Sequence, residues 1–232
     1  MSAPFAIISL DSEKTNAEVF AQQLGSNFLQ WGFCGIQDHR IDLNLIDNVM
    51  ELFEEFFALP LTTKMQYFDT KLKGARGYTP TRIETPKGSN FADLKEFWHV
   101  GRELESPHPF SKWMHKNFDV TEIRVFKEST NALFDQFDLL GQSLLAAIAI
   151  FLDLDKHYFV KHAGLGNSIM RAIHYPPIQQ EDHAERAGAH EDINLITLLL
   201  GGHQSGLELL TKTGKWEKIQ VDREVVICNI GD

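Results

Sequence analysis

A histidine and an acid stand two residues apart, directly before an almost unbroken apolar run, in AGAHEDINLITLL at 188–200. Alternate residues of an extended backbone point to the same side. His190 and Asp192 can therefore converge on one small object, for which a metal ion is the obvious candidate. Glu191 should point away from it. The pair alone is weak evidence, because a solvated or core-satisfied histidine is the ordinary interpretation of such a residue.

Composition limits the classes of function. The 232 residues are 43% hydrophobic and 23% charged, as in ordinary globular proteins. A net charge of −10 argues against binding to nucleic acid, because no excess of cations is present to contact phosphates. The N-terminus does not resemble a secretory signal, and the apolar run at 143–152 is too short to span a bilayer. We expect neither nucleic acid nor a membrane as a partner, and the oligomeric state stays open.

The two cysteines, Cys34 and Cys228, lie far apart in the sequence. They predict neither a disulfide framework nor a thiolate zinc site, and they fit a reducing cytoplasm. A zinc hydrolase that uses histidine and aspartate ligands is disfavoured, because no HExxH motif or cysteine pair accompanies the site.

Helices are expected first along the chain and strands later. After a strand at 5–9, Asp11 or Ser12 can cap a helix with Phe20, Leu24, Phe28 and Trp31 on one face. A second helix is expected to begin near residue 43 and to stop at 59–60. Residues 70–117 are expected to form loops and short strands. A long helix is expected to start at Thr121 and Glu122. From residue 165, five strands separated by turn signals predict an antiparallel sandwich or barrel.

Several segments, taken in order, resemble the isopenicillin N synthase-like family of iron(II) and 2-oxoglutarate-dependent oxygenases. They are WGFCGIQDHRI, FFALPLTTKMQY, RGYTP with DLKEFWHVG, YPP, AHEDINLITLL, GLELLTKTGKWEKI and VVICNIGD. The resemblance implies an α+β fold, in which an N-terminal helical segment packs on a partial double-stranded β-helix, or jelly-roll, core. It divides the chain into an N-terminal dioxygenase domain at 1–118, a connecting helix and loop at 119–164, and a partial jelly-roll domain at 165–232.

The resemblance also implies the chemistry. Two histidines and one carboxylate commonly hold Fe²⁺ in such oxygenases and leave positions open for a co-substrate and O2. His190 and Asp192 would be two of these ligands. 2-Oxoglutarate would be converted to succinate and CO2 while a small organic substrate is hydroxylated or otherwise oxidised. A non-catalytic binding protein with a vestigial metal site is the alternative.

Two residues of RAIHYPP are candidates for binding 2-oxoglutarate. Tyr175 matches a tyrosine that contacts it in relatives, and Arg171 could bind a carboxylate through a forked pair of hydrogen bonds or form an ordinary surface salt bridge. His174 should face the other way and have a structural or surface role, not a ligand role. His183 and His203 fall in polar segments, and Tyr78, Asp93 and Glu96 match family positions that shape a loop near the entrance.

The chain stops at NIGD, whereas the resemblance places the second histidine ligand and an Arg-x-Ser pair on later strands. The expectation is a fragment of a longer reading frame. Sequencing the gene past Asp232 should then reveal a histidine in a strand pattern, followed by Arg-x-Ser or Arg-x-Thr. A verified stop codon would favour the binding-protein alternative.

Overall fold

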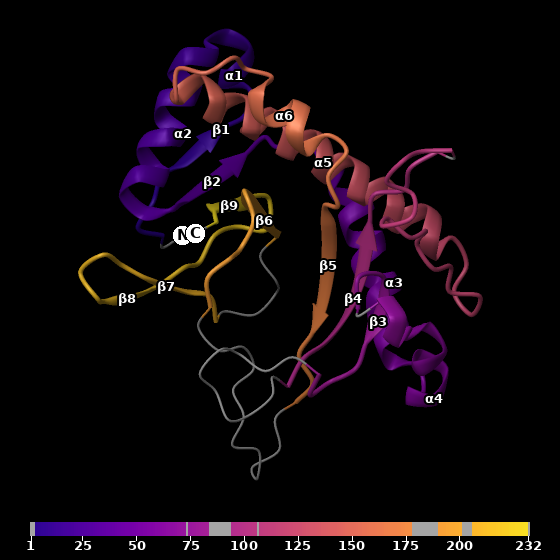
Figure 1. Cartoon of the computed structure of the whole chain (residues 1–232). Coiled ribbons are helices and arrows are strands. Elements are labelled where there is room, and N and C mark those ends of the chain that lie inside the picture. The colour runs from indigo at the N-terminus through magenta and orange to yellow at the C-terminus, as the bar shows by residue number, and fades with distance from the viewer. Residues whose placement is uncertain are drawn as a thin grey trace. The chain divides into compact units, whose positions relative to one another are not determined.

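The computed structural model describes residues 3–72, 74–83, 94–105, 107–177, 190–200 and 206–231. It forms two compact units, each made of separate stretches of the chain (Figure 1). The first unit holds residues 1–41, 137–164 and 191–232, and the second holds residues 42–136 and 165–190. Since these units interleave along the chain, the division at 1–118, 119–164 and 165–232 stays a prediction about sequence segments.

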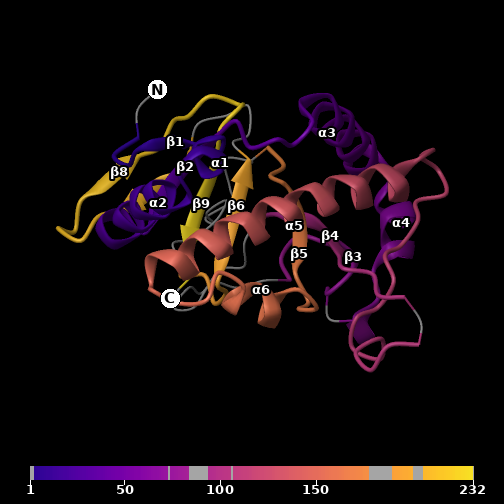
Figure 2. The same ribbon diagram turned by 90° about the horizontal axis from the view of Figure 1, so that it is seen from above.

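The first unit contains a four-stranded sheet in the order β1, β2, β9, β6. Its strands are β1 (Ile7–Ser9), β2 (Phe33–Gln37), β6 (Ile196–Leu200) and β9 (Val226–Ile230), and Figure 2 shows β9 and β6 side by side. The β9–β6 pair is antiparallel, as predicted for the strands after residue 165. The β2–β9 pair, which the sequence did not predict, is antiparallel as well. The β1–β2 pair is parallel. A helix connects the two strands and carries the chain back, so that β2 starts beside the start of β1 and runs in the same direction.

That helix is α2 (Ala17–Trp31), with Phe20, Leu24 and Phe28 buried as expected. Its cap is Asn16, whose side chain accepts a hydrogen bond from the Val19 amide. Asp11 precedes only the short α1 (Ser12–Thr15) and makes no side-chain cap bond, so the expected cap at Asp11 or Ser12 is wrong. Gly32 ends α2 at φ 72°, a left-handed conformation that glycine adopts without strain.

A hairpin of β7 (Glu208–Leu210) and β8 (Trp216–Lys218) completes the strands of this unit. It closes a small core, in which four buried side chains cluster: Phe5, Leu209, Ile219 and Ile227. In the sheet, Cys34 of β2 lies opposite Cys228 of β9, and both are buried free thiols. Burial raises the pKa of Cys34 to about 12, so the thiol stays protonated and packs as a small apolar group.

The second unit is built on an antiparallel sheet of β3 (Gly77–Thr79), β4 (Glu96–Gly101) and β5 (Ile169–His174). Helix α3 (Leu43–Ala58) packs on it through Phe56, whose ring lies 5.7 Å from Tyr78 and 4.7 Å from Trp98. α4 (Leu61–Lys64) and two short 3-10 helices, η1 (Met65–Tyr67) and η2 (Thr70–Leu72), follow. This aromatic core fixes the sheet that carries Arg171.

The long helix α5 runs over Phe126–Phe151, and α6 (Tyr158–Ala163) follows it (Figure 2). The expected start at Thr121 and Glu122 is wrong: these residues bind Tyr67, whose hydroxyl donates to the Glu122 carboxylate and accepts from the Thr121 amide. Val125 at φ 56° then interrupts any helix before Phe126.

By length and composition α5 could cross a membrane, which the short apolar run at 143–152 did not suggest. The core helix of a soluble protein meets the same criterion. The buried face of α5 includes Phe126, Leu133, Leu140 and Leu144. We therefore read α5 as a core helix.

Glu96 is the centre of a buried network of hydrogen bonds in the second unit. The Glu96 carboxylate accepts hydrogen bonds from Lys64 Nζ at 2.9 and 3.1 Å and from the Tyr78 hydroxyl, and it lies 2.8 Å from His174 Nδ1. Tyr78 and Glu96, expected to shape a loop at the entrance, are instead buried in the sheet. Burial alone would raise the pKa of Glu96, but bonds from Tyr78, Lys64 and His174 outweigh it and hold the pKa below 4.5.

Replacing Glu96 with glutamine should lower the free energy of unfolding near neutral pH by about 3–5 kcal/mol, because the buried Lys64 ammonium loses its counter-charge. The folded pKa is depressed, so this contribution is complete above pH 4.5 and is lost as the pH falls from there through the folded pKa. Urea denaturation at several pH values measures it. The exposed Glu105→Gln variant is the control, and equal stability losses in the two variants would contradict the assignment.

Candidate functional site

Asp192 is half-buried in the first unit, and its carboxylate is held by two donors. The Thr197 hydroxyl donates to Oδ2 at 2.6 Å, and the Asn229 amide Nδ2 donates to the same oxygen at 2.9 Å. Hydrogen bonds to an ionised acceptor are the stronger kind. The orientation of this carboxylate is therefore set by the protein.

Strand pairing explains why these two donors meet. Thr197 of β6 and Asn229 of β9 are direct cross-strand partners, and directly opposed residues of an antiparallel pair project from the same face of the sheet. The segment that carries Asp192 enters β6 just before Thr197. Both donors are therefore placed by sheet register beside the acid.

Gly231 allows the end of β9 to approach the turn that carries the acid. A Cβ at residue 231 would lie 1.8 Å from the Asn194 carbonyl oxygen and 2.7 Å from the Asp192 carbonyl oxygen. The Gly231 amide donates to the Leu195 carbonyl at 3.2 Å. This close approach of two backbones leaves no room for a side chain, which gives the glycine of NIGD a structural reason.

His190 and Glu191 are exposed and precede Asp192 in a stretch without regular secondary structure. The predicted convergence of His190 with Asp192 stays a prediction. Among the residues that the structure describes, no group of three histidine, cysteine, aspartate or glutamate side chains is placed to hold a metal ion. An imidazole and an oriented carboxylate are nevertheless the donor types that suit Fe²⁺, and they fit two positions of such a site.

Arg171 lies on β5 of the second unit, opposite His99 of β4. Its Nε donates to His99 Nε2 at 2.6 Å, and its guanidinium lies 4.3 Å from the centre of the Phe97 ring. Since His99 Nε2 accepts, its Nδ1 carries the proton and donates to the Gly74 carbonyl. The guanidinium plane is therefore fixed by a stack and a hydrogen bond, which is a good basis for binding a planar carboxylate.

The other candidates on β5 follow the alternation of a strand. Exposed and less exposed residues alternate along β5, and Arg171 is exposed. Ile173 and Tyr175, at every second position after it, are 40% and 37% exposed. This agrees with the prediction that the three side chains share one face. His174 points the other way, binds Glu96 and stacks on Phe57 with ring centres 5.2 Å apart, so its predicted structural role is confirmed. Asp93, His183 and His203 lie outside the described residues.

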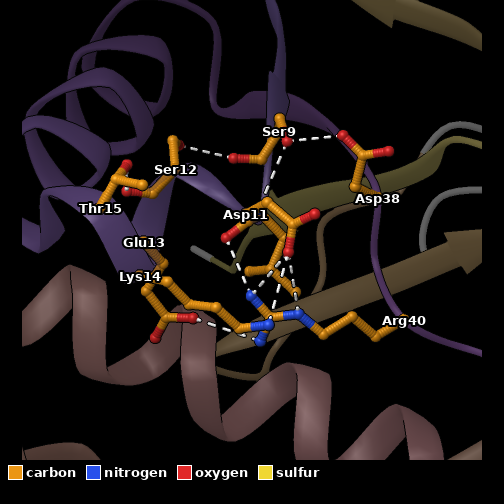
Figure 3. A network of polar contacts seen from close by, with 9 residues as sticks. Ser9, Asp11, Ser12, Glu13, Lys14, Thr15, Asp38 and Arg40 are labelled. Carbon is orange, nitrogen blue, oxygen red and sulfur yellow. Dashed lines mark hydrogen bonds and ion pairs between the residues drawn. The ribbon is translucent and has the colours of Figure 1, made fainter.

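A second group of charges lies in the first unit around Arg40 (Figure 3). Arg40 pairs with Asp11 at 3.3 Å and with Glu13 at 3.7 Å, and Ser9 donates to Asp38 at 2.5 Å. A hollow beside it is lined by Glu13, Lys14, Ala17, Ala146, Ala147, Ile150 and Lys156. The Asp11 side chain is 62% exposed, and solvent screens such pairs. We regard this cluster as surface pairing that ties β1, α1 and the end of β2 together.

Sequence reasoning missed Thr197, Asn229 and His99. Asn229 is the first residue of the NIGD motif, and Thr197 follows Asp192 by five residues, but neither position by itself indicates a contact with Asp192. Their role depends on the β6–β9 register, a long-range feature. His99 was likewise part of DLKEFWHVG, but its contact with Arg171 depends on the pairing of β4 with β5.

Two family models match the chain. A model described as "non-haem dioxygenase in morphine synthesis N-terminal" matches residues 4–121, and one described as "2OG-Fe(II) oxygenase superfamily" matches residues 166–232. Among individual proteins, the 2-oxoglutarate-Fe(II) type oxidoreductase hxnY of Emericella nidulans is 31% identical over 87% of this chain. The match covers 61% of that relative, so the chain spans less than two thirds of its length.

Solved structures agree with these matches. A 2OG-Fe(II) oxygenase family protein from Caulobacter crescentus is 42% identical with a TM-score of 0.89, covering all of this chain and 75% of the other. A full-length Neurospora crassa protein in complex with alpha-KG is 26% identical with a TM-score of 0.83, over 97% of this chain and 72% of the other. The predicted α+β fold with a jelly-roll core is confirmed. The chain belongs to the 2OG-Fe(II) oxygenase superfamily.

Proposed function

We propose that the protein couples the oxidative decarboxylation of 2-oxoglutarate to the oxidation of a small organic substrate, with Fe²⁺ as its metal. The observation that carries the proposal is the oriented carboxylate of Asp192, two residues after His190, in a chain matched by both family models. The relatives named above support it, because one is a 2-oxoglutarate-Fe(II) type oxidoreductase and another was solved in complex with alpha-KG.

His190 and Asp192 would hold the metal, His190 through a ring nitrogen and Asp192 through its carboxylate. When bound, iron and 2-oxoglutarate would supply the oxidation: one oxygen atom of O2 would go to succinate and the other to a hydroxylated product, or to water in an oxidation without hydroxylation, and CO2 would be released. The chain's own contribution is to hold the Asp192 carboxylate in one orientation before the metal arrives.

Arg171 and Tyr175 would bind 2-oxoglutarate. The guanidinium of Arg171, held by Phe97 and His99, would donate to a carboxylate, and the Tyr175 hydroxyl would donate a further hydrogen bond. A neutral His99 with its proton on Nδ1 supports this arrangement, because it adds no second cation that would repel the guanidinium.

Two narrower assignments are part of the same proposal. The sequence motifs favour the isopenicillin N synthase-like branch of the superfamily, and the matched N-terminal model supports that placement. A cytoplasmic location is supported by Cys34 and Cys228, which face each other in the sheet as free thiols.

The alternative is a non-catalytic binding protein with a vestigial site. The retention of His190 and Tyr175 together with an oriented Asp192 carboxylate speaks against this alternative, because a vestigial site has no need of all three. Measured turnover decides between the two.

The protein expressed from its complete gene should release succinate and consume O2 only when both Fe²⁺ and 2-oxoglutarate are supplied. His190→Ala and Asp192→Ala should each reduce succinate release to the metal-free background, because each removes a ligand. Succinate is measured by mass spectrometry and O2 by an electrode, over a panel of small organic substrates.

Glu191→Ala is the matched control, since Glu191 is exposed and lies between the two ligands; its activity should stay near that of the parent. Tyr175→Phe should raise the KM for 2-oxoglutarate by roughly 2- to 10-fold, the value of one hydrogen bond. Undiminished succinate release in the His190 variant would rule out the ligand assignment.

A further inference from the structure

The hydrogen bonds to Asp192 form a directed chain. Asn194 Nδ2 donates to Thr197 Oγ1 at 2.9 Å, and Thr197 Oγ1 donates to Asp192 Oδ2 at 2.6 Å. A hydroxyl has one proton to give. Because the amide of Asn194 can only donate here, the proton of Thr197 is directed to the carboxylate.

Asn229 acts on the same oxygen from the neighbouring strand. Its Nδ2 lies 2.9 Å from Asp192 Oδ2, and an amide nitrogen can serve only as a donor. Two donors on different strands fix the carboxylate more tightly than one, because rotation about the side chain would break at least one bond.

We propose that Thr197 and Asn229 are positioning residues of the metal site. They hold Oδ2 of Asp192 and thereby fix the orientation in which this carboxylate meets a metal ion. The inference rests on the proposed function, in which Asp192 is a ligand. Partners that orient a ligand in this way typically contribute roughly 10- to 100-fold to metal affinity.

A purely structural role is the competing explanation. In that case the bonds only fasten the 192–197 turn to β9, and their loss would lower the stability of the metal-free protein without changing metal affinity in the folded fraction. Metal affinity and metal-free stability must therefore be measured together.

The experiment uses the protein expressed from its complete gene, with Mn²⁺ as the probe. Binding is followed through the electron paramagnetic resonance signal of free Mn²⁺, and the thermal midpoint of the metal-free protein is recorded for each variant. Thr197→Val keeps the shape of the side chain but removes the donor, and it should raise the Kd roughly 10- to 100-fold. Asn229→Ala should act in the same direction.

Two control variants separate the donor from the shape. Thr197→Ser restores a hydroxyl and should bring the Kd back to within a few-fold of the parent. Thr211→Val removes a hydroxyl that also makes hydrogen bonds, to Thr213 and Lys215 near the β7–β8 turn, and its Kd should equal that of the parent. If Thr197→Val does not fold, the Asn229→Ala and Thr197→Ser results carry the test.

Asp192→Ala distinguishes this inference from the proposed function. If it weakens Mn²⁺ binding while Thr197→Val and Asn229→Ala do not, the positioning role is overturned and the ligand assignment stands. If Asp192→Ala leaves Mn²⁺ binding unchanged, the ligand assignment itself fails, and the inference fails with it.

Discussion

The two hydrogen bonds that Asp192 Oδ2 accepts from Thr197 and Asn229 are the interaction on which the site depends. A carboxylate on an irregular segment would otherwise sample several rotamers, and each would present a different oxygen to a metal. Donors on two paired strands remove that freedom before any metal binds. The ordering of the ligand is then achieved during folding.

The rest of the first unit keeps those two strands in register. β9 is flanked by β2 and β6. Its first three residues, 226–228, are buried, and Cys228 lies opposite Cys34 of β2. A slip of one residue would turn Asn229 to the other face and bury a polar amide in that core. Gly231 then brings the strand end against the turn at 192–194, where any larger residue would collide with backbone.

Local features were predictable from the sequence and long-range ones were not. The spacing of Phe20, Leu24 and Phe28 predicted α2, because helical periodicity is written in neighbouring residues. The start of α5 was wrong because Thr121 and Glu122 bind Tyr67, more than fifty residues away. The parallel β1–β2 pair was not predicted, because local patterns indicate a strand or a helix but not which strands become neighbours.

The candidate site divides in the same way. The residues of HED and the strand face of Arg171 came from spacing and resemblance, whereas Thr197, Asn229 and His99 depend on which strands pair. The types of ligand were therefore accessible from the sequence, and the groups that orient them were not. Orientation is a property of register, and register is set by the whole sheet.

The most direct test of this account is a crystal structure of the protein with Mn²⁺ and 2-oxoglutarate, in which anomalous scattering locates the metal. The account predicts the metal at coordination distance from a His190 ring nitrogen and from the Asp192 carboxylate, with Oδ2 still bound to Thr197 and Asn229. A metal bound elsewhere, or bound through an Oδ2 that has released both donors, would contradict it.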